Sequence, residues 1–278
     1  MTYRTALLLP VVALAVVCAL VLGVAAFRVG SSVRDEAASP GPSPTAESAG
    51  RAFQPEASVC QGLLHRPDAK ASRKLPDVYT KRAEAAGITI VGNKDVSDSA
   101  MGQAVKTVER IFKNNDLEQR LAEEGAYLII AAEKQGVLDL PEFACLGQTT
   151  RIDFNHVCGV ADRADYPVAT VNELDLVGDH KGPCAGLNIL YHEVGHLVQG
   201  WTISPADYFD VRRFYQQAID TGIYKRGTDY ATTNANEYFA ESTQSYFLWQ
   251  NVNGSRDRAW LKRNDPDMFS LLMEIYGE

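Results

Sequence analysis

Cysteine, histidine and basic charge are all scarce in this chain of 278 residues. Five cysteines are present, and no two of them are spaced as Cys-x-x-Cys, which argues against a zinc site built from thiolates. The formal net charge is −8, from 27 basic and 35 acidic side chains. Because no basic patch with interleaved aromatic residues offsets this charge, the composition argues against nucleic acid as a partner.

Two of the five histidines form the most informative motif of the chain. Residues 187–199 read Leu-Asn-Ile-Leu-Tyr-His-Glu-Val-Gly-His-Leu-Val-Gln, and their apolar residues recur at helical spacing, which predicts an amphipathic helix. His192 and His196 then lie one turn apart and can direct their rings to one point, a spacing that suits Zn²⁺. Glu193 would lie beside the metal and accept a proton from its water. The alternative is two core histidines beside a glutamate that faces solvent.

A third metal ligand is expected from residues 230–249, which predict a second helix that Thr and Asn residues begin and that closes near residues 253–254. Glu237 and Glu241 lie one turn apart on a largely apolar helix, where carboxylates are unfavourable unless they are paired or bind a cation. We therefore predict that Glu237 is the third zinc ligand and that Glu241 holds the free ring nitrogen of a ligand histidine. In the alternative, Asn234-x-x-Glu237 is a capping arrangement in which Glu237 binds backbone N–H groups.

These motifs carry a family resemblance. His-Glu-Val-Gly-His, followed about forty residues later by a Tyr seven positions before Glu-Tyr-Phe-Ala-Glu, resembles the catalytic domain of anthrax lethal factor. It resembles even more the small secreted Pro-Pro endopeptidases that share this domain, and the similarity extends from about Ile88 to the C-terminus. The substrate-binding loops of that family are not matched, so its preference for cutting between two prolines is not carried over.

The resemblance implies a role for each residue of the motifs. His192, His196 and Glu237 would bind one Zn²⁺ per chain, Glu193 would be the general base and Glu241 would support the ligands. Tyr230 would donate its phenol to the negative oxygen of the reaction intermediate. Among 12 tyrosines, however, Tyr230 is also compatible with a plain packing residue.

The amino-terminal part of the chain predicts export. Residues 6–27 form a charge-free apolar run, long enough to span a bilayer and long for the core of a signal peptide, so residues 1–28 are read as a signal peptide or a membrane anchor. Residues 29–58 are rich in Ser, Pro and Ala and predict a flexible linker. The catalytic part is expected outside the cytoplasm, either secreted or tethered to the membrane.

The cysteines after the apolar run fit an exported protein, because an even number of them predicts two disulfides with three alternative pairings. These residues are Cys60, Cys145, Cys158 and Cys184. One hypothesis pairs Cys145 with Cys158 and leaves Cys60 to reach Cys184 near the zinc helix. Among the remaining histidines, the spacing of His65 and His156 does not suggest a second metal site. His180 lies in a loop just before the zinc helix and is expected to be a surface residue, with contact to the substrate as the alternative.

Residues 59–278 are long enough for one sizeable domain. Short β-like runs at residues 88–91, 126–132 and 168–174 predict a small mixed sheet, and the rest is expected to be helical, including residues 104–112, 204–222 and a terminal helix from Pro266. The fold class is therefore α+β, a zincin-like metallopeptidase domain with the zinc site on the helix that carries the histidines. Residues 168–174 are expected to be an edge strand that pairs with the substrate backbone.

The function predicted from these features is that of an extracytoplasmic zinc endopeptidase, acting as a monomer on a protein or peptide substrate. A related hypothesis keeps the chemistry but directs it at the peptide cross-links of a cell wall. The alternative from a different class is a catalytically silent module that binds a peptide or cell-wall component without cutting it. Glu193 favours catalysis, because it has no role in holding the metal.

Overall fold

The computed structural model describes residues 75–144, 146, 157–161, 167–177, 187–248 and 256–277. The apolar run of residues 6–27 and the linker of residues 29–58 lie outside these ranges, so the expectations for them stay predictions. Within the described ranges, no helix combines the length and the apolar character that crossing a bilayer requires.

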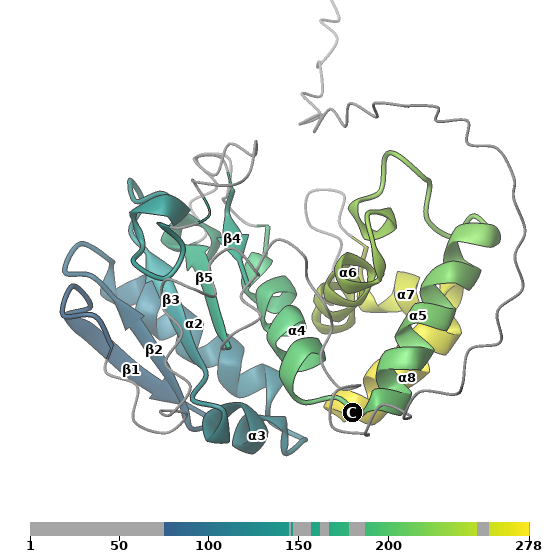
Figure 1. The fold of residues 1–278 in the computed structure, drawn as a ribbon, viewed down its shortest axis with the longest axis horizontal. Helices are drawn as coiled ribbons and strands as arrows, with labels where there is room; N and C mark the ends of the chain where they lie inside the picture. The colour runs from purple at the N-terminus through teal and green to yellow at the C-terminus, as the bar shows by residue number, and fades with distance from the viewer. Residues whose placement is uncertain are drawn as a thin grey trace, which may run out of the picture. The chain divides into compact units, whose positions relative to one another are not determined.

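Five strands form one mixed sheet, ordered β1-β2-β3-β5-β4 (Figure 1). The strands are β1 (Lys81–Ala85), β2 (Ile88–Gly92), β3 (Tyr127–Ala131), β4 (Gly159–Val160) and β5 (Val168–Asn172). β2, β3 and β5 run parallel, with Leu128 opposite Ile90 on one side and Ala169 on the other. The outer strands β1 and β4 are antiparallel to their neighbours. The turn between β1 and β2 is made by Ala86 and Gly87, both at positive φ, as in the tight turns that match the twist of a hairpin.

Seven α-helices belong to the described part of the chain. They are α2 (Asp98–Ile111), α3 (Leu117–Glu123), α4 (Ile189–Trp201), α5 (Pro205–Asp220), α6 (Ala235–Phe247), α7 (Arg258–Asn264) and α8 (Pro266–Tyr276). Their starts follow from local capping: Ser97 caps α2, and Ser204 and Asp207 form a reciprocal capping box at α5. Proline occupies the first turn of α5 and of α8, where a backbone N–H would have no acceptor within the helix, so its absence costs no helical hydrogen bond.

The core has two parts, because both faces of the sheet are covered. The larger cluster joins one sheet face to the helices and includes Ile90 and Leu128 together with Val194 and Leu197 of α4. The smaller cluster covers the other face with residues such as Tyr127, Ile129 and Phe143. α4 packs on β5 and also on α6, so it lies between the sheet and the helical half, as Figure 1 shows.

The α+β class with a small mixed sheet is confirmed, but one expectation is wrong. Residues 168–174 were expected to form an edge strand, whereas β5 pairs with β3 on one side and with β4 on the other. Residues 173–175 leave the strand and form a 3-10 helix. The outermost strand on this side of the described sheet is β4, whose two residues are too few to produce an alternating pattern in the sequence.

Candidate metal centre

Helix α4 carries three ionisable side chains into the interior. His192, Glu193 and His196 are 5 %, 5 % and 7 % exposed. The helix begins after Asn188, which has a φ of 59° and makes no side-chain cap of its own. The N–H of Leu190 instead donates to Oδ2 of the buried Asp175 at 3.3 Å, from the 3-10 helix that follows β5. A carboxylate at this end of a helix satisfies free N–H groups and suits the helix dipole.

Helix α6 presents two carboxylates to α4. Its start is capped by Asn234, whose Oδ1 accepts the N–H groups of Asn236 and Glu237 at 2.8 and 3.0 Å. The carboxylate of Glu237 contacts the ring nitrogens of His192 and His196 rather than backbone N–H groups. Asn234 therefore does the capping alone, and the carboxylate of Glu237 stays available for other chemistry.

Gly195, between the two histidines, brings the helices together. A Cβ built on this residue would lie 3.2 Å from Cα of Ala240 and 3.1 Å from Cβ of Thr243, both on α6. The absence of a side chain thus permits a close approach of α4 to α6. The side chain of Gln244 on α6 also donates to the carbonyl of Leu187, just before α4 begins.

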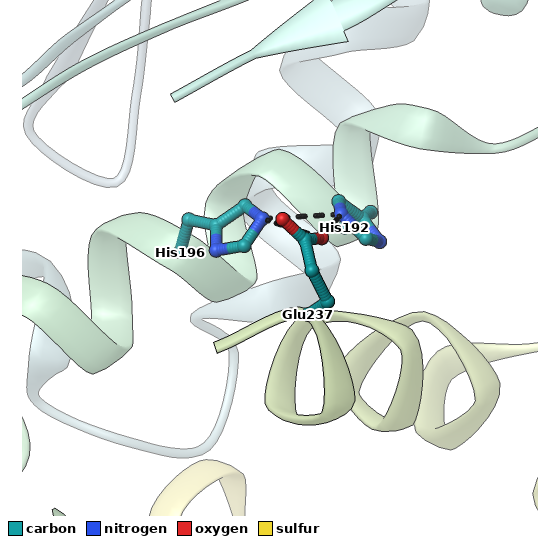
Figure 2. Close-up of side chains that lie close together, drawn as sticks. All are labelled: His192, His196 and Glu237. Atoms are coloured by element: carbon teal, nitrogen blue, oxygen red, sulfur yellow. Dashed lines mark hydrogen bonds and ion pairs between the residues drawn. The ribbon is translucent and has the colours of Figure 1, made fainter. Parts of the chain in front are cut away.

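Figure 2 shows the result: His192 and His196 from one helix and Glu237 from the other converge on one point. The two Nε2 atoms are 3.1 Å apart. Oε2 of Glu237 lies 3.1 Å from Nε2 of His192 and 3.4 Å from Nε2 of His196. Three potential ligand atoms therefore form a nearly equilateral triangle in the interior.

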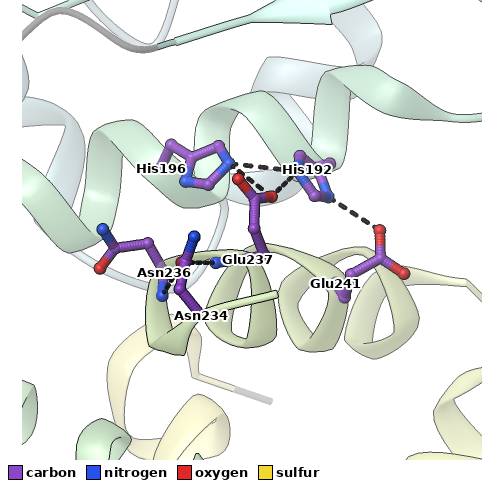
Figure 3. A network of polar contacts seen from close by, with 6 residues as sticks. All are labelled: His192, His196, Asn234, Asn236, Glu237 and Glu241. Carbon is purple, nitrogen blue, oxygen red and sulfur yellow. Dashed lines mark hydrogen bonds and ion pairs between the residues drawn. The ribbon is translucent and has the colours of Figure 1, made fainter. Parts of the chain in front are cut away.

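Glu241 lies one turn further along α6, on the other side of His192. Its Oε1 lies 3.1 Å from Nδ1 of His192, an ion-pair distance, although the contact does not have hydrogen-bond geometry (Figure 3). His192 therefore has a carboxylate beside each ring nitrogen. Within the described residues, Nδ1 of His196 is buried without a hydrogen-bond partner.

The carboxylates change the proton affinities of this cluster. Burial alone would lower the pKa of His192, but the contacts of Glu237 and Glu241 outweigh it, and the net shift is well upward. The pKa of His196 is also raised, because Glu237 outweighs burial there too. Burial acts to raise the pKa of Glu237, but its contacts with His192 and His196 prevail and hold that pKa far below its usual range. The group thus behaves as a coupled set of one carboxylate and two imidazoles.

The donor atoms fit a zinc ion. Zn–N and Zn–O bonds of about 2.0–2.1 Å at tetrahedral angles place neighbouring ligand atoms about 3.3 Å apart. The three separations in the cluster, 3.1, 3.1 and 3.4 Å, lie around this value. Two nitrogen donors and one carboxylate oxygen also form a donor set that zinc accepts, and three protein ligands leave a fourth position open.

Glu193 lies on the sheet side of α4, against β4. A Cβ built on Gly159 would be 2.7 Å from Oε1 of Glu193, 2.8 Å from its Cγ and 2.6 Å from Cγ2 of Ile189. The position that Glu193 adopts thus depends on the missing side chain of Gly159. The amino-acid sequence does not indicate this role of Gly159, because a single glycine carries no signal of what lies against it.

Tyr230 lies beside the ring of His192. It belongs to a 3-10 helix, η7 (Tyr230–Thr232), and its ring centroid is 6.0 Å from that of His192, at an interplanar angle of 34°. The residue is 58 % exposed, so it is not a core packing residue. Its phenol can therefore meet a molecule that approaches the histidines from solvent.

The other predicted residues are mostly outside the described ranges. This holds for His65, His156 and His180, and for Cys60, Cys145 and Cys184. Cys158, directly before β4, is described and is disulfide-bonded. Its partner is not among the described residues, so the pairing stays a prediction. The role of Asp175 has no local signal in the sequence, since its contact with α4 depends on the tertiary fold.

Two comparisons with known proteins bear on the family to which the chain belongs. A family model described as anthrax toxin lethal factor, N- and C-terminal domain, matches residues 80–275, which include every described strand and helix except the last residue of α8. No curated protein matches the chain. Since the match spans well over half of the sequence, the chain belongs to the anthrax toxin lethal factor family.

Proposed function

We propose that this protein is a zinc-dependent endopeptidase that acts outside the cytoplasm, with a zincin-like active site on α4 and α6. The observation that carries the proposal is the convergence of Nε2 of His192, Nε2 of His196 and Oε2 of Glu237 at the separations of a zinc coordination shell. These three residues would hold one Zn²⁺. When bound, the ion supplies a Lewis acid that makes a water molecule nucleophilic near neutral pH.

The residues around the ligands divide the remaining work. The carboxylate of Glu193 accepts the proton of the attacking water and returns it to the leaving amine, a role typically worth about 10²–10⁴-fold. The phenol of Tyr230 donates a hydrogen bond to the negative oxygen that develops on the substrate carbonyl. Glu241 orients the ring of His192 through Nδ1, which keeps Nε2 directed at the metal position.

Burial supports a catalytic role for Glu193. The residue is 5 % exposed and adjoins two imidazoles, and it makes none of the contacts within the triangle of ligand atoms. A site that only binds metal or peptide has no need of a buried carboxylate at this position. The silent binding module is therefore the less favoured function.

The secreted or tethered location is part of the proposal and is supported by the apolar run of residues 6–27 and by the disulfide at Cys158. We expect a protein or peptide substrate and a monomeric enzyme. Hydrolysis of peptide cross-links in a cell wall would use the same residues on a different substrate.

The test is digestion of a proteome-derived peptide library by the purified protein and by its Glu193→Gln variant. Metal analysis first establishes whether each form holds one zinc. We expect cleavage by the wild type alone, with equal zinc in both forms, and the cut sites report the substrate preference, including any preference for proline. Zinc in both forms without cleavage by either would favour the binding module, and absence of zinc from both would refute the metal site.

A further inference from the structure

An ion pair outside the metal cluster stabilises the turn of residues 225–232, which includes Tyr230. Nη2 of Arg256, at the start of the segment leading into α7, lies 2.8 Å from Oδ2 of Asp229. The two side chains are only 27 % and 21 % exposed, so the pair is better shielded from solvent than a typical surface salt bridge. Asp229 is the residue immediately before Tyr230 and the cap of η7.

Asp229 binds the turn at several points. Its carboxylate accepts the N–H of Lys225 at 2.5 Å, and its own N–H donates to the carbonyl of Lys225 at 3.0 Å. Its carbonyl accepts both the N–H and the hydroxyl of Thr232, at 2.9 and 2.8 Å. Residues 225–232 are therefore organised around Asp229, and a shift of this residue would move the backbone of Tyr230.

Arg256 is itself immobilised by aromatic rings. Its Cζ lies 4.7 Å from the ring centroid of Tyr224 and 4.5 Å from that of Trp260, and these two rings contact each other with centroids 5.5 Å apart. Such cation–π contacts favour a planar guanidinium over the ammonium of lysine. The guanidinium is thus a fixed support to which Asp229 is bound.

The position of Tyr230 depends on this support through its backbone. Its side chain is 58 % exposed, so the core covers little of its surface, and the place of its backbone largely sets where its ring lies. Tyr230 nevertheless lies above His192 at a defined distance and angle. The backbone of η7 is anchored on its other side by Tyr215, whose hydroxyl donates to the carbonyl of Thr232 at 2.9 Å.

From these contacts we infer that Arg256 is a positioning residue, which acts through Asp229 to hold Tyr230 over the metal site. The inference rests on the proposed function, since Tyr230 must act on the substrate for its position to affect turnover. Small displacements of a catalytic group lower rates by roughly 10- to 100-fold, so the expected effect lies in kcat.

The test is a double-mutant cycle on peptide cleavage, with Arg256→Met made in the wild type and in Tyr230→Phe. Arg256→Met is expected to lower kcat roughly 10- to 100-fold in the wild type, with zinc content unchanged, and to have almost no further effect in Tyr230→Phe. Arg256→Lys, which keeps the charge but not the planar fork, should recover part of the rate. Arg212→Met, an exposed arginine on α5, is the matched control and should leave kcat unchanged.

Hydrogen–deuterium exchange gives a readout that does not depend on activity. Faster exchange is expected in Arg256→Met in the peptide covering residues 225–233, with no change in α4 and no change in the Arg212 variant. An equal loss of kcat from Arg256→Met in both backgrounds, or unchanged exchange, would overturn the inference. A zinc-loaded wild type that cuts no peptide would count against the proposed function instead, and the exchange result would then decide the role of Arg256 alone.

Discussion

The side chain of Glu193 of α4 occupies the space that a side chain at Gly159 of β4 would need. A Cβ on Gly159 would stand 2.7 Å from Oε1 of Glu193 and 2.6 Å from Cγ2 of Ile189, closer than atoms of this kind approach. Because Glu193 is buried, its carboxylate has little freedom to move aside. β4, the outer strand beside β5 in the described sheet, thus determines where the proposed general base lies.

Gly159→Ala is therefore expected to lower peptide cleavage roughly 10- to 100-fold while zinc content stays at the wild-type level, since the base moves and the ligands do not. Steady-state kinetics with metal analysis checks this result. The control is Gly102→Ala in α2, where a Cβ meets nothing within 4 Å. Unchanged kcat in Gly159→Ala would show that Glu193 does not need its observed position.

The contact of Gly195 with α6 leads to a different expectation, because its neighbours there include backbone. An alanine would force α6 away from α4 by a few tenths of an ångström and would move Glu237 away from the histidines. Gly195→Ala should weaken zinc binding, by roughly tenfold if the shift distorts one ligand. Competition with a chromophoric chelator measures the affinity.

Gly200→Ala is the matched control on the same helix, since a Cβ there meets nothing within 4 Å. It should keep the zinc affinity and stabilise the protein by up to about 1 kcal/mol, the usual gain from removing a helical glycine. Equal zinc affinities for the Gly195 and Gly200 variants would mean that the helix separation does not control the metal site.

The sequence predicted the helices of the site well because their signals are local. The apolar periodicity of residues 187–199 places α4, whose bounds are Ile189–Trp201. The Thr and Asn residues before α6 (Ala235–Phe247) mark its start, but the helix was expected to close near residues 253–254, whereas its last residue is Phe247 and residues 230–232 form a separate 3-10 helix. The family resemblance is confirmed by the match over residues 80–275. The roles of the individual residues are not tested by that match and stay predictions.

The elements that the sequence did not reveal lack such local signals. β1 reads Lys-Arg-Ala-Glu-Ala, and its charged side chains do not predict a strand, although one forms by pairing with β2. β4 has two residues, and its place outside β5 is decided by tertiary contacts. The functions inferred for Gly159, Asp175 and Arg256 depend on atoms brought from distant parts of the chain. Local sequence patterns therefore identify the proposed metal ligands but not the residues that position the site.

The raised pKa values of the histidines predict that zinc binding releases protons. In the metal-free protein the contacts of Glu237 and Glu241 keep His192 protonated above its ordinary pKa of 6.5, and zinc must displace that proton. The apparent affinity for zinc should therefore rise with pH, about tenfold per pH unit for each proton released. Chelator competition at several pH values around neutrality measures this slope, and an affinity independent of pH would contradict the coupling.

The same shift gives the metal-free protein a stability that depends on pH. A histidine whose pKa is higher in the folded than in the unfolded state stabilises the fold fully below pH 6.5, and loses that contribution as the pH rises through its folded pKa. Metal-free protein should thus become less stable above pH 6.5. Zinc-loaded protein should not show this loss, because the ligands are then deprotonated at both ends of the range.

Asp175 should produce a pH dependence at lower pH. Burial raises the pKa of its carboxyl from 3.8 to about 6, although the backbone N–H groups of residues 187–190 at the start of α4 oppose the shift. A carboxyl with a raised folded pKa contributes most to stability below pH 3.8, and the contribution is lost as the pH rises to about 6. At about 1.4 kcal/mol per pKa unit the loss amounts to roughly 3 kcal/mol.

Asp175→Asn removes this titration but keeps an oxygen that can accept the N–H of Leu190. The free energy of unfolding of the wild type, relative to that of the variant, should therefore fall by roughly 2 kcal/mol between pH 4 and pH 7, in favour of the variant, since the rest of the loss occurs below pH 4. Urea denaturation of both proteins at matched pH values measures the difference, and groups that titrate equally in both cancel. A difference that is constant across this range would show that Asp175 ionises in the folded protein at its usual pKa. The buried carboxyl at the start of α4 would then be ionised, rather than largely protonated, at mildly acidic pH.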